Sequence, residues 1–185
     1  IILLVTLFST TILYAAPKIN SVANNNNYLF VQLKTLPIID INITFNNGSF
    51  TDGELKGLTN LSLNTIMSSD VDNKKIISYF ENIGAKLSYS TGKESLSITI
   101  RTLNDIDQAL VLMNIINRAL RTEILDSNVL SLEKDRILRR IADSTKQPAT
   151  LLNSSISAKL FPNSGLAHKV IGNKNSINKI TDTQI

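Results

Sequence analysis

The stretch Gly57-Leu58-Thr59-Asn60-Leu61-Ser62-Leu63-Asn64-Thr65-Ile66-Met67 decides how the rest of the chain is interpreted. It predicts one amphipathic helix, with Thr51-Asp52 ahead of it as a candidate N-cap. On a helix, Asn60 and Asn64 are four residues apart and therefore share a face, with Leu63 beside them. From the helix alone, an ordinary core helix with two polar residues is the favoured interpretation.

The same spacing is that of an H-x-x-E-H zinc helix, in which two His side chains hold the metal and a Glu activates a water. Asn60, Leu63 and Asn64 fill those three places here. Asparagine is a poor zinc ligand, and a leucine side chain cannot move a proton. The alternative to a core helix is therefore a zinc-protease helix that has lost its zinc.

Composition excludes several kinds of functional site. The 185 residues include no cysteine and one histidine, His168. Disulfides, thiol catalysis and Cys-type zinc sites are therefore excluded. A zinc site would need one His with carboxylates, which is an unusual set. The net charge is +4, but Lys and Arg are scattered and Trp is absent, so we expect no nucleic-acid partner.

Residues 1–16, IILLVTLFSTTILYAA, form an apolar run that ends in small residues. We interpret it as the core of a signal peptide, cleaved after Ala15, whose charged start lies upstream. The alternative is an uncleaved anchor helix, which would be the chain's one contact with a membrane. Both interpretations predict an exported protein, either periplasmic or secreted. Residues 17–27 contain the run Asn24–Asn27 and are predicted to be a linker. Residues 28–185 are predicted to form one domain.

Hydrophobic periodicity predicts an α+β fold in which helices pack on a mostly antiparallel sheet. The predicted strands are Tyr28–Leu33, Ile39–Phe45, Leu87–Thr91 and Ser95–Thr102. After the Gly57 helix, the predicted helices are Lys74–Asn82 (capped by Asp72-Asn73), 104–121 (capped by Asn104), Asn128–Thr145, Pro148–Leu160 and a short one near Ser176–Ile180. The expected buried stripe of the 104–121 helix is Ile106, Ala109, Leu110, Met113, Ile116, Ala119 and Leu120.

Several stretches in a fixed order resemble the N-terminal domain of the insulinase-like zinc metallopeptidases, a family that includes pitrilysin and the mitochondrial processing peptidase. The resemblance covers residues 28–185, and it rests on order and spacing because no single motif is strong. The stretches are Leu36-Pro37 before a strand, Gly48-Ser49, Gly57-Leu58, Ile83-Gly84-Ala85, Leu132–Ile141 with Pro148, Leu160-Phe161-Pro162, Val170-Ile171-Gly172 and Ile177–Thr181.

The resemblance places the family's zinc motif on residues that do not suit zinc. The two metal His fall on Asn60 and Asn64, and the catalytic Glu falls on Leu63. The third ligand, a Glu on a later helix, falls on Arg140. A guanidinium adds positive charge where a dication would lie. The resemblance therefore implies a protein with no catalytic residues, no metal and no cofactor at these positions, although active members of the family use zinc.

Three other features have competing interpretations. Glu133 and Asp135 are expected to lie on a solvated helix face. Arg136 and Arg139 are expected on the same kind of face, and the alternative is an anion-binding cluster with Arg140. Arg140 could instead be buried against Asn60 and Asn64, whose oxygens would accept its hydrogen bonds. His168 is a weak candidate ligand, since the loop that holds it is not a metal site in the family.

The resemblance implies an exported, catalytically silent relative of these peptidases. Its expected role is to bind peptides or unfolded polypeptide, or to complete the chamber of an active partner subunit. One alternative is an active zinc metallopeptidase whose catalytic site lies in a domain outside this sequence. Another is a non-enzymatic structural protein of the cell envelope. The domain is expected to continue beyond residue 185 with more strands and a second, similar domain.

Overall fold

The computed structural model describes residues 19–21, 28–31, 36–121 and 126–185. The chain divides into two units, residues 1–37 and residues 38–185. In the first, β1 (Ile19–Ser21) pairs antiparallel with β2 (Leu29–Val31). β1 therefore lies within the stretch predicted to be a linker. The predicted signal segment, residues 1–16, lies outside the described residues.

The second unit is built on a three-stranded antiparallel sheet in the order β3-β7-β6. Its strands are β3 (Ile38–Phe45), β6 (Lys86–Thr91) and β7 (Leu96–Leu103). Ile41 pairs with Ile100 and Ile43 with Ile98, so one face of the sheet is apolar. The intervening residues of β3, such as Asp40 and Asn42, are exposed on the other face. The period-two alternation of the sequence sets this division.

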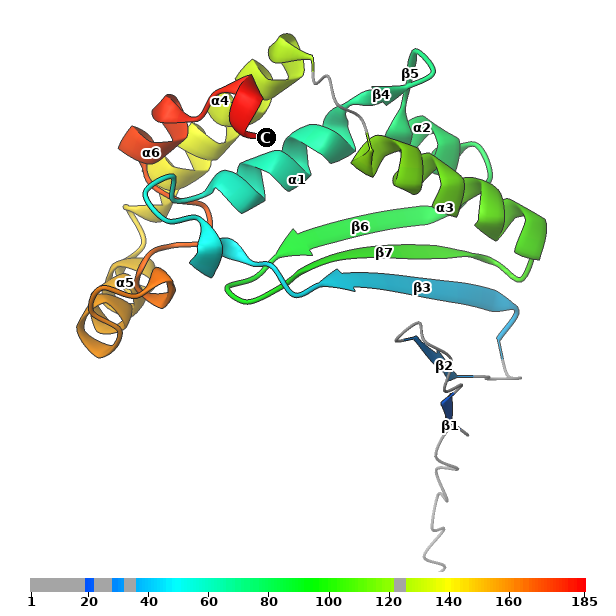
Figure 1. The fold of residues 1–185 in the computed structure, drawn as a ribbon, viewed down its shortest axis with the longest axis horizontal. Coiled ribbons are helices and arrows are strands. Elements are labelled where there is room, and N and C mark those ends of the chain that lie inside the picture. Colours follow the sequence, from blue (N-terminus) through cyan, green and yellow to red (C-terminus); the bar gives the residue numbers. More distant parts are fainter. Residues whose placement is uncertain (1–18, 22–27, 32–35, 122–125) are drawn as a thin grey trace, which may run out of the picture. The chain divides into compact units, whose positions relative to one another are not determined.

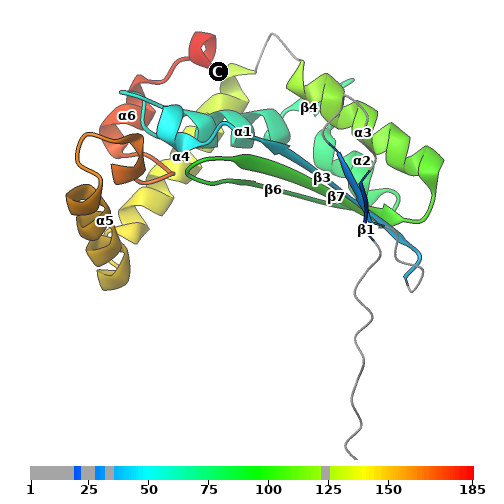
Figure 2. The ribbon, with the colours of Figure 1, turned by 60° about the horizontal axis from the view of Figure 1, so that its bottom comes forward.

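Three helices cover the apolar face of the sheet: α1 (Leu58–Ser68), α2 (Ile76–Glu81) and α3 (Ile106–Leu120) (Figures 1 and 2). The helices and the sheet together form the larger hydrophobic cluster of the unit, which includes Leu63, Met67, Phe80, Ile98, Ile100, Leu112 and Ile116. The predicted α+β class, with helices packed on an antiparallel sheet, is confirmed.

The N-terminus of α1 is held by a carboxylate that precedes it by six residues. Asp52 follows the short helix η1 (Ser49–Thr51) and accepts hydrogen bonds from the backbone N–H of Gly57 at 2.8 Å and of Thr59 at 3.0 Å. The Thr59 hydroxyl donates to the same side chain at 2.6 Å. Asp52 thus satisfies donors that the first turn of the helix leaves open. The predicted cap therefore acts across a loop and not from the adjacent position.

The segment after α1 differs from the prediction. Asp72 and Asn73 were expected to cap a helix, but both have positive φ, 54° and 59°. They form the turn of a small hairpin between β4 (Asp70–Val71) and β5 (Lys74–Lys75). Two successive positive-φ residues are typical of a type I′ turn, and Asp and Asn tolerate that conformation. The helix that follows, α2, therefore starts at Ile76 and not at Lys74.

The cap and the buried stripe of α3 also differ from the prediction. Asp105, one residue after the expected Asn104, accepts hydrogen bonds from the N–H groups of Asp107 and Gln108. The buried residues are Ala109, Leu112, Ile115, Ile116 and Ala119, whereas Ile106, Leu110 and Met113 are exposed. The apolar residues of α3 form two adjacent stripes, one with Ala109, Leu112 and Ile116 and one with Ile106, Leu110 and Met113. Packing against α2 and β7 selects the first as the buried side.

A second, smaller cluster lies on the other side of α1. It joins Leu61 to α4 (Ser127–Ser144) and α6 (Lys174–Lys179), through Leu130, Ile137, Ile177 and Ile180. Between these helices come α5 (Pro148–Leu160), which has no buried residue, and η2 (Gly165–Ala167). The short helix η3 (Asp182–Gln184) follows α6. α1 is therefore the element that both clusters share.

Within the described ranges, no helix has the length and apolarity needed to cross a lipid bilayer.

Candidate functional site

The site is a pocket of about 310 Å³ beside α1, here called the α1 pocket. One wall comes from α1 and a second from the last three residues of β6. One residue of α4 and the loop before α6 complete it. Its lining residues are Asn60, Leu63, Asn64, Tyr89, Ser90, Thr91, Arg140, Val170 and Ile171.

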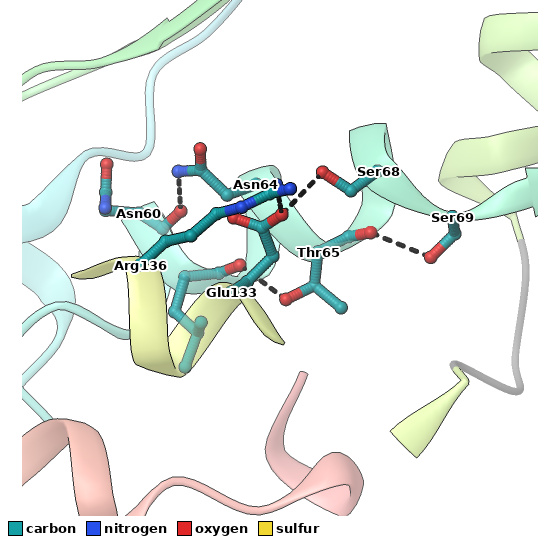
Figure 3. Close-up of polar contacts among 8 residues, drawn as sticks. Asn60, Asn64, Thr65, Ser68, Ser69, Glu133 and Arg136 are labelled. Carbon is teal, nitrogen blue, oxygen red and sulfur yellow. Dashed lines mark hydrogen bonds and ion pairs between the residues drawn. The ribbon is translucent and has the colours of Figure 1, made fainter. Parts of the chain in front are cut away.

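The four residues singled out in the sequence lie together in this pocket. Asn60, Leu63 and Asn64 come from successive turns of α1, and Arg140 comes from α4. The two Asn side chains extend from one side of the helix, as their spacing requires (Figure 3). Asn64 Nδ2 donates to the backbone oxygen of Asn60 at 2.6 Å. Packing of α4 on α1 is what brings Arg140 to residues that precede it by 76 to 80 positions in the chain.

Two buried polar atoms of the lining residues have no hydrogen-bond partner among the described residues. Asn60 is only 7% exposed, yet its Nδ2 has no hydrogen-bond partner, and the same holds for the buried Thr91 hydroxyl. Arg140 is exposed and makes no hydrogen bond or ion pair with any described residue. The alternative in which Arg140 is buried and bonded to Asn60 and Asn64 is therefore wrong. An exposed guanidinium keeps its hydration, so it needs no acceptor from the chain.

Glu133 contradicts the expectation of a solvated helix face. Its residue is 4% exposed, and its carboxylate accepts a hydrogen bond from Ser68 Oγ at 2.8 Å and pairs with Arg136 (Figure 3). Asp135, two residues on, is exposed as predicted. The missed signal is positional, because Glu133 lies at helical spacing between the buried residues Leu130 and Ile137.

The lining residues do not fit a zinc ion. Zinc in proteins takes Cys, His, Asp or Glu ligands, and none of the nine residues is of these types. Nowhere in the described ranges do three such side chains gather into a possible metal site. Arg140 contributes a permanent positive charge, which repels a dication. His168 is not a lining residue, and its ring Nδ1 lies 3.1 Å from the backbone oxygen of Lys169.

The wall formed by Val170 and Ile171 was not predicted to belong to a site. It is held against α1 by two glycines with positive φ, Gly57 at 96° and Gly172 at 73°. A Cβ on Gly172 would lie 2.0 Å from the backbone oxygen of Lys56, so only glycine permits this approach. In the residues just before this wall, the backbone oxygens of Leu166 and His168 accept hydrogen bonds from the Lys93 ammonium. Burial lowers the pKa of Lys93.

The pocket residues Tyr89, Ser90 and Thr91 were also missed, because in sequence they are three residues of a strand. The strand order, which puts β6 at an edge next to α1, is what brings them to the site.

The sequence model of the family described as Insulinase (Peptidase family M16) matches residues 31–174, which include α1, α4 and every lining residue of the pocket. The chain belongs to the insulinase family. The predicted resemblance is thereby confirmed. A comparison with curated protein sequences gave no match.

Solved structures share the insulinase-family fold. A peptidase M16 inactive domain from Pseudomonas fluorescens is 24% identical, with a TM-score of 0.81 over 92% of this chain. A protease from Helicobacter pylori is 17% identical, with a TM-score of 0.75 over 91% of this chain. A chain of Complex III2 from Candida albicans is 16% identical, with a TM-score of 0.61 over 82% of this chain. The present chain spans 42%, 42% and 34% of their respective lengths.

Proposed function

We propose that this chain is a catalytically inactive member of the insulinase family that binds peptides or completes the chamber of an active partner subunit. The observation that carries the proposal is the chemistry of the α1 pocket. Two amides, a leucine and an arginine stand where the resemblance places three metal ligands and a base. Metal-assisted hydrolysis needs a bound water of lowered pKa and a base beside it, and these four side chains supply neither.

Metal content tests this proposal directly. The full-length protein without its signal segment is incubated with excess zinc, washed and measured by elemental analysis. Near-zero zinc is the expected result. One tightly held zinc per chain would sink the proposal, and it would favour the alternative of an active peptidase with its site in another domain.

A variant with restored ligands tests whether the pocket is the former metal site. The triple change Asn60→His, Asn64→His and Arg140→Glu gives a His₂Glu set on the same two helices. It is expected to bind about one zinc per chain. The matched control is Asn60→His with Asn64→His, in which Arg140 still repels the metal, and it is expected to bind far less. Equal zinc content in the two variants would mean that Arg140 does not face the metal position.

The sheet supports a peptide-binding role. β6 pairs with β7 and is an edge strand of the described sheet. Its residues Tyr89, Ser90 and Thr91 also line the α1 pocket. An extended peptide can add to an exposed strand edge through its main-chain hydrogen bonds while a side chain enters a neighbouring pocket. A peptide on β6 would therefore pass the pocket mouth.

Backbone methylation of the peptide tests strand addition without altering the protein. Fluorescent extended peptides are measured by anisotropy against the full-length, signal-free protein. N-methylation of alternate peptide bonds removes the donors that would pair with β6, so it is expected to weaken binding about tenfold or more. Binding that survives methylation in both alternate registers would exclude strand addition.

The partner and the location belong to the same proposal. The partner role is supported by the likeness of the fold to a chain of Complex III2 from Candida albicans. The apolar run at residues 1–16 supports export. Affinity capture with an active M16 peptidase of the same cell tests the partner role. Cell fractionation with N-terminal sequencing tests export. Failure to bind either an active relative or peptides would favour the structural envelope protein.

A further inference from the structure

Three residues that line the α1 pocket carry hydrogen-bond donors that the described chain does not use. Asn60 Nδ2 and the Thr91 hydroxyl are buried without partners, and the Arg140 guanidinium is unpaired among the described residues. Folded proteins satisfy nearly all buried polar groups, because a group removed from water without a partner destabilises the fold. Two such groups on residues that line one pocket, beside a guanidinium unpaired among the described residues, favour a ligand that supplies acceptors there.

The charge of the pocket restricts that ligand to an anion. Arg140 is the one charged residue among the nine that line it. The nearby acid Glu133 is already engaged by Ser68 and Arg136, and Asp135 does not line the pocket. No lining carboxylate therefore neutralises Arg140 or repels an incoming anion. A planar guanidinium with amide and hydroxyl donors beside it matches the geometry of a carboxylate.

The walls of the pocket favour a carboxylate carried on an organic group. Leu63, Val170 and Ile171 are apolar, and the Tyr89 ring adds to them. A volume of about 310 Å³ accommodates one amino-acid residue, at the lower end of the range of ligand pockets. The position beside the β6 edge points to a residue of a bound peptide.

We propose that the α1 pocket binds a carboxylate of a peptide, held by Arg140, Asn60 Nδ2 and the Thr91 hydroxyl. The inference rests on the peptide-binding role proposed above and names the group that is recognised. The carboxylate has two possible sources, the C-terminus of the peptide or an Asp or Glu side chain. In either case the positive charge that excludes a metal becomes the main recognition element.

Four versions of one fluorescent peptide test the proposal by anisotropy. The peptide carries either a free C-terminus or an amide, and either an internal Glu or a Gln, and it is measured against the full-length, signal-free protein. Loss of affinity on amidation identifies the C-terminus as the source, and loss on Glu-to-Gln exchange identifies the side chain. Equal affinity for all four versions would overturn the proposal.

Variants of the protein assign the effect to Arg140. Arg140→Gln is expected to weaken the carboxylate peptide about tenfold or more and to leave the neutral peptide unchanged. Arg139→Gln is the matched control, since Arg139 is an exposed neighbour on α4 that does not line the pocket. Arg140 is itself exposed, so its replacement is expected to preserve the fold, which circular dichroism checks.

The outcomes separate the two proposals. If peptides bind but Arg140→Gln does not discriminate between carboxylate and neutral versions, the carboxylate site is wrong and the peptide-binding role stands. If none of the four versions of the peptide binds, the peptide-binding role is wrong, and the carboxylate site, which rests on that role, is wrong as well.

Discussion

At the scale of single residues, Glu133 and Asn60 show two different ways of burying a polar group. Glu133 Oε1 accepts hydrogen bonds within the chain, from Ser68 and Arg136. Asn60 has a buried Nδ2 with no partner. Because an unpaired buried group is costly and a paired one is close to neutral, Glu133 is best explained by stability and Asn60 by a ligand.

The contribution of Glu133 is measurable against its neighbour on the same helix. Glu133→Ala removes the acceptor of the Ser68 hydroxyl and is expected to cost about 1–3 kcal/mol of unfolding free energy. Asp135→Ala, at an exposed position of α4, is expected to change it by less than about 0.5 kcal/mol. Urea denaturation of both variants checks the difference, and equal losses would mean that the Glu133 contacts add nothing.

The pair of Asp40 and Arg101 predicts a small dependence of stability on pH. Arg101 donates to both carboxylate oxygens of Asp40, at 2.6 and 2.8 Å, and these hydrogen bonds lower the pKa of Asp40 from its usual 3.8. A carboxyl whose pKa is lower in the folded state stabilises the fold above its unfolded pKa, and this stabilisation is lost as the pH falls through the folded value. Both side chains are exposed, so the effect is reduced by solvent.

Acid titration of the denaturant midpoint checks this expectation. The wild-type protein is expected to lose slightly more stability than Asp40→Asn as the pH falls below about 4. Concentrated salt is expected to reduce the difference, because it screens an exposed pair. A steeper loss in Asp40→Asn than in the wild type would contradict the assignment.

At the scale of elements, α1 owes its position to neighbours on two sides and to a loop at its start. Leu63 and Met67 belong to the larger hydrophobic cluster, on the sheet. Leu61 belongs to the smaller cluster, with α4 and α6. Gly172 brings the 170–172 loop onto the backbone just before α1. The pocket therefore has two walls, α1 and β6, that belong to elements packed in the core, and a third wall that depends on a backbone contact.

Two glycine substitutions separate the effect of this contact from backbone strain. Gly84 and Gly172 have similar positive φ, 67° and 73°, but only Gly172 faces backbone atoms. Gly84→Ala is expected to cost about 1 kcal/mol from the left-handed conformation alone. Gly172→Ala is expected to cost more and to weaken peptide binding, because Val170 and Ile171 must move. Denaturation together with peptide affinity measures both effects, and identical behaviour of the two variants would contradict the contact.

At the scale of the whole described unit, burial is unevenly distributed. The two clusters around α1 contain the core, whereas α5 has no buried residue and exposes Leu151, Leu152, Ile156 and Leu160. An isolated helix of this length is marginally stable in water, so α5 depends on the little packing it has. Its opening is expected to require less free energy than opening of α1 or β7.

Hydrogen exchange measures this order. Backbone amides of α5 are expected to exchange faster than those of α1 by about tenfold or more, and those of β7 are expected to be among the slowest. Exchange of α5 as slow as that of α1 would contradict the prediction, and it would show that another surface covers the exposed leucines.

The sequence predicted most of the fold because most of its signals are local. Alternation in β3 and β7, the proline at the start of α5 and the acids near the helix starts locate elements to within a few residues. The errors fall where two local solutions compete. Asp72-Asn73 suits a helix cap and a type I′ turn equally, and α3 has two adjacent apolar stripes, either of which fits a core-facing side.

By itself, the sequence determined the chemistry of the candidate site. The helical spacing puts Asn60 and Asn64 on one face, and the chain has no cysteine and one histidine. These features decide which hydrogen-bond donors and metal ligands are available. Only the tertiary structure decided which groups meet and which are buried. Arg140 reaches the α1 pocket because α4 packs on α1, and Thr91 reaches it because β6 is an edge strand. Glu133 is buried while Asp135 two residues away is not. The physical reason is that residue type and spacing are local properties, whereas burial and hydrogen-bond satisfaction depend on packing between distant segments.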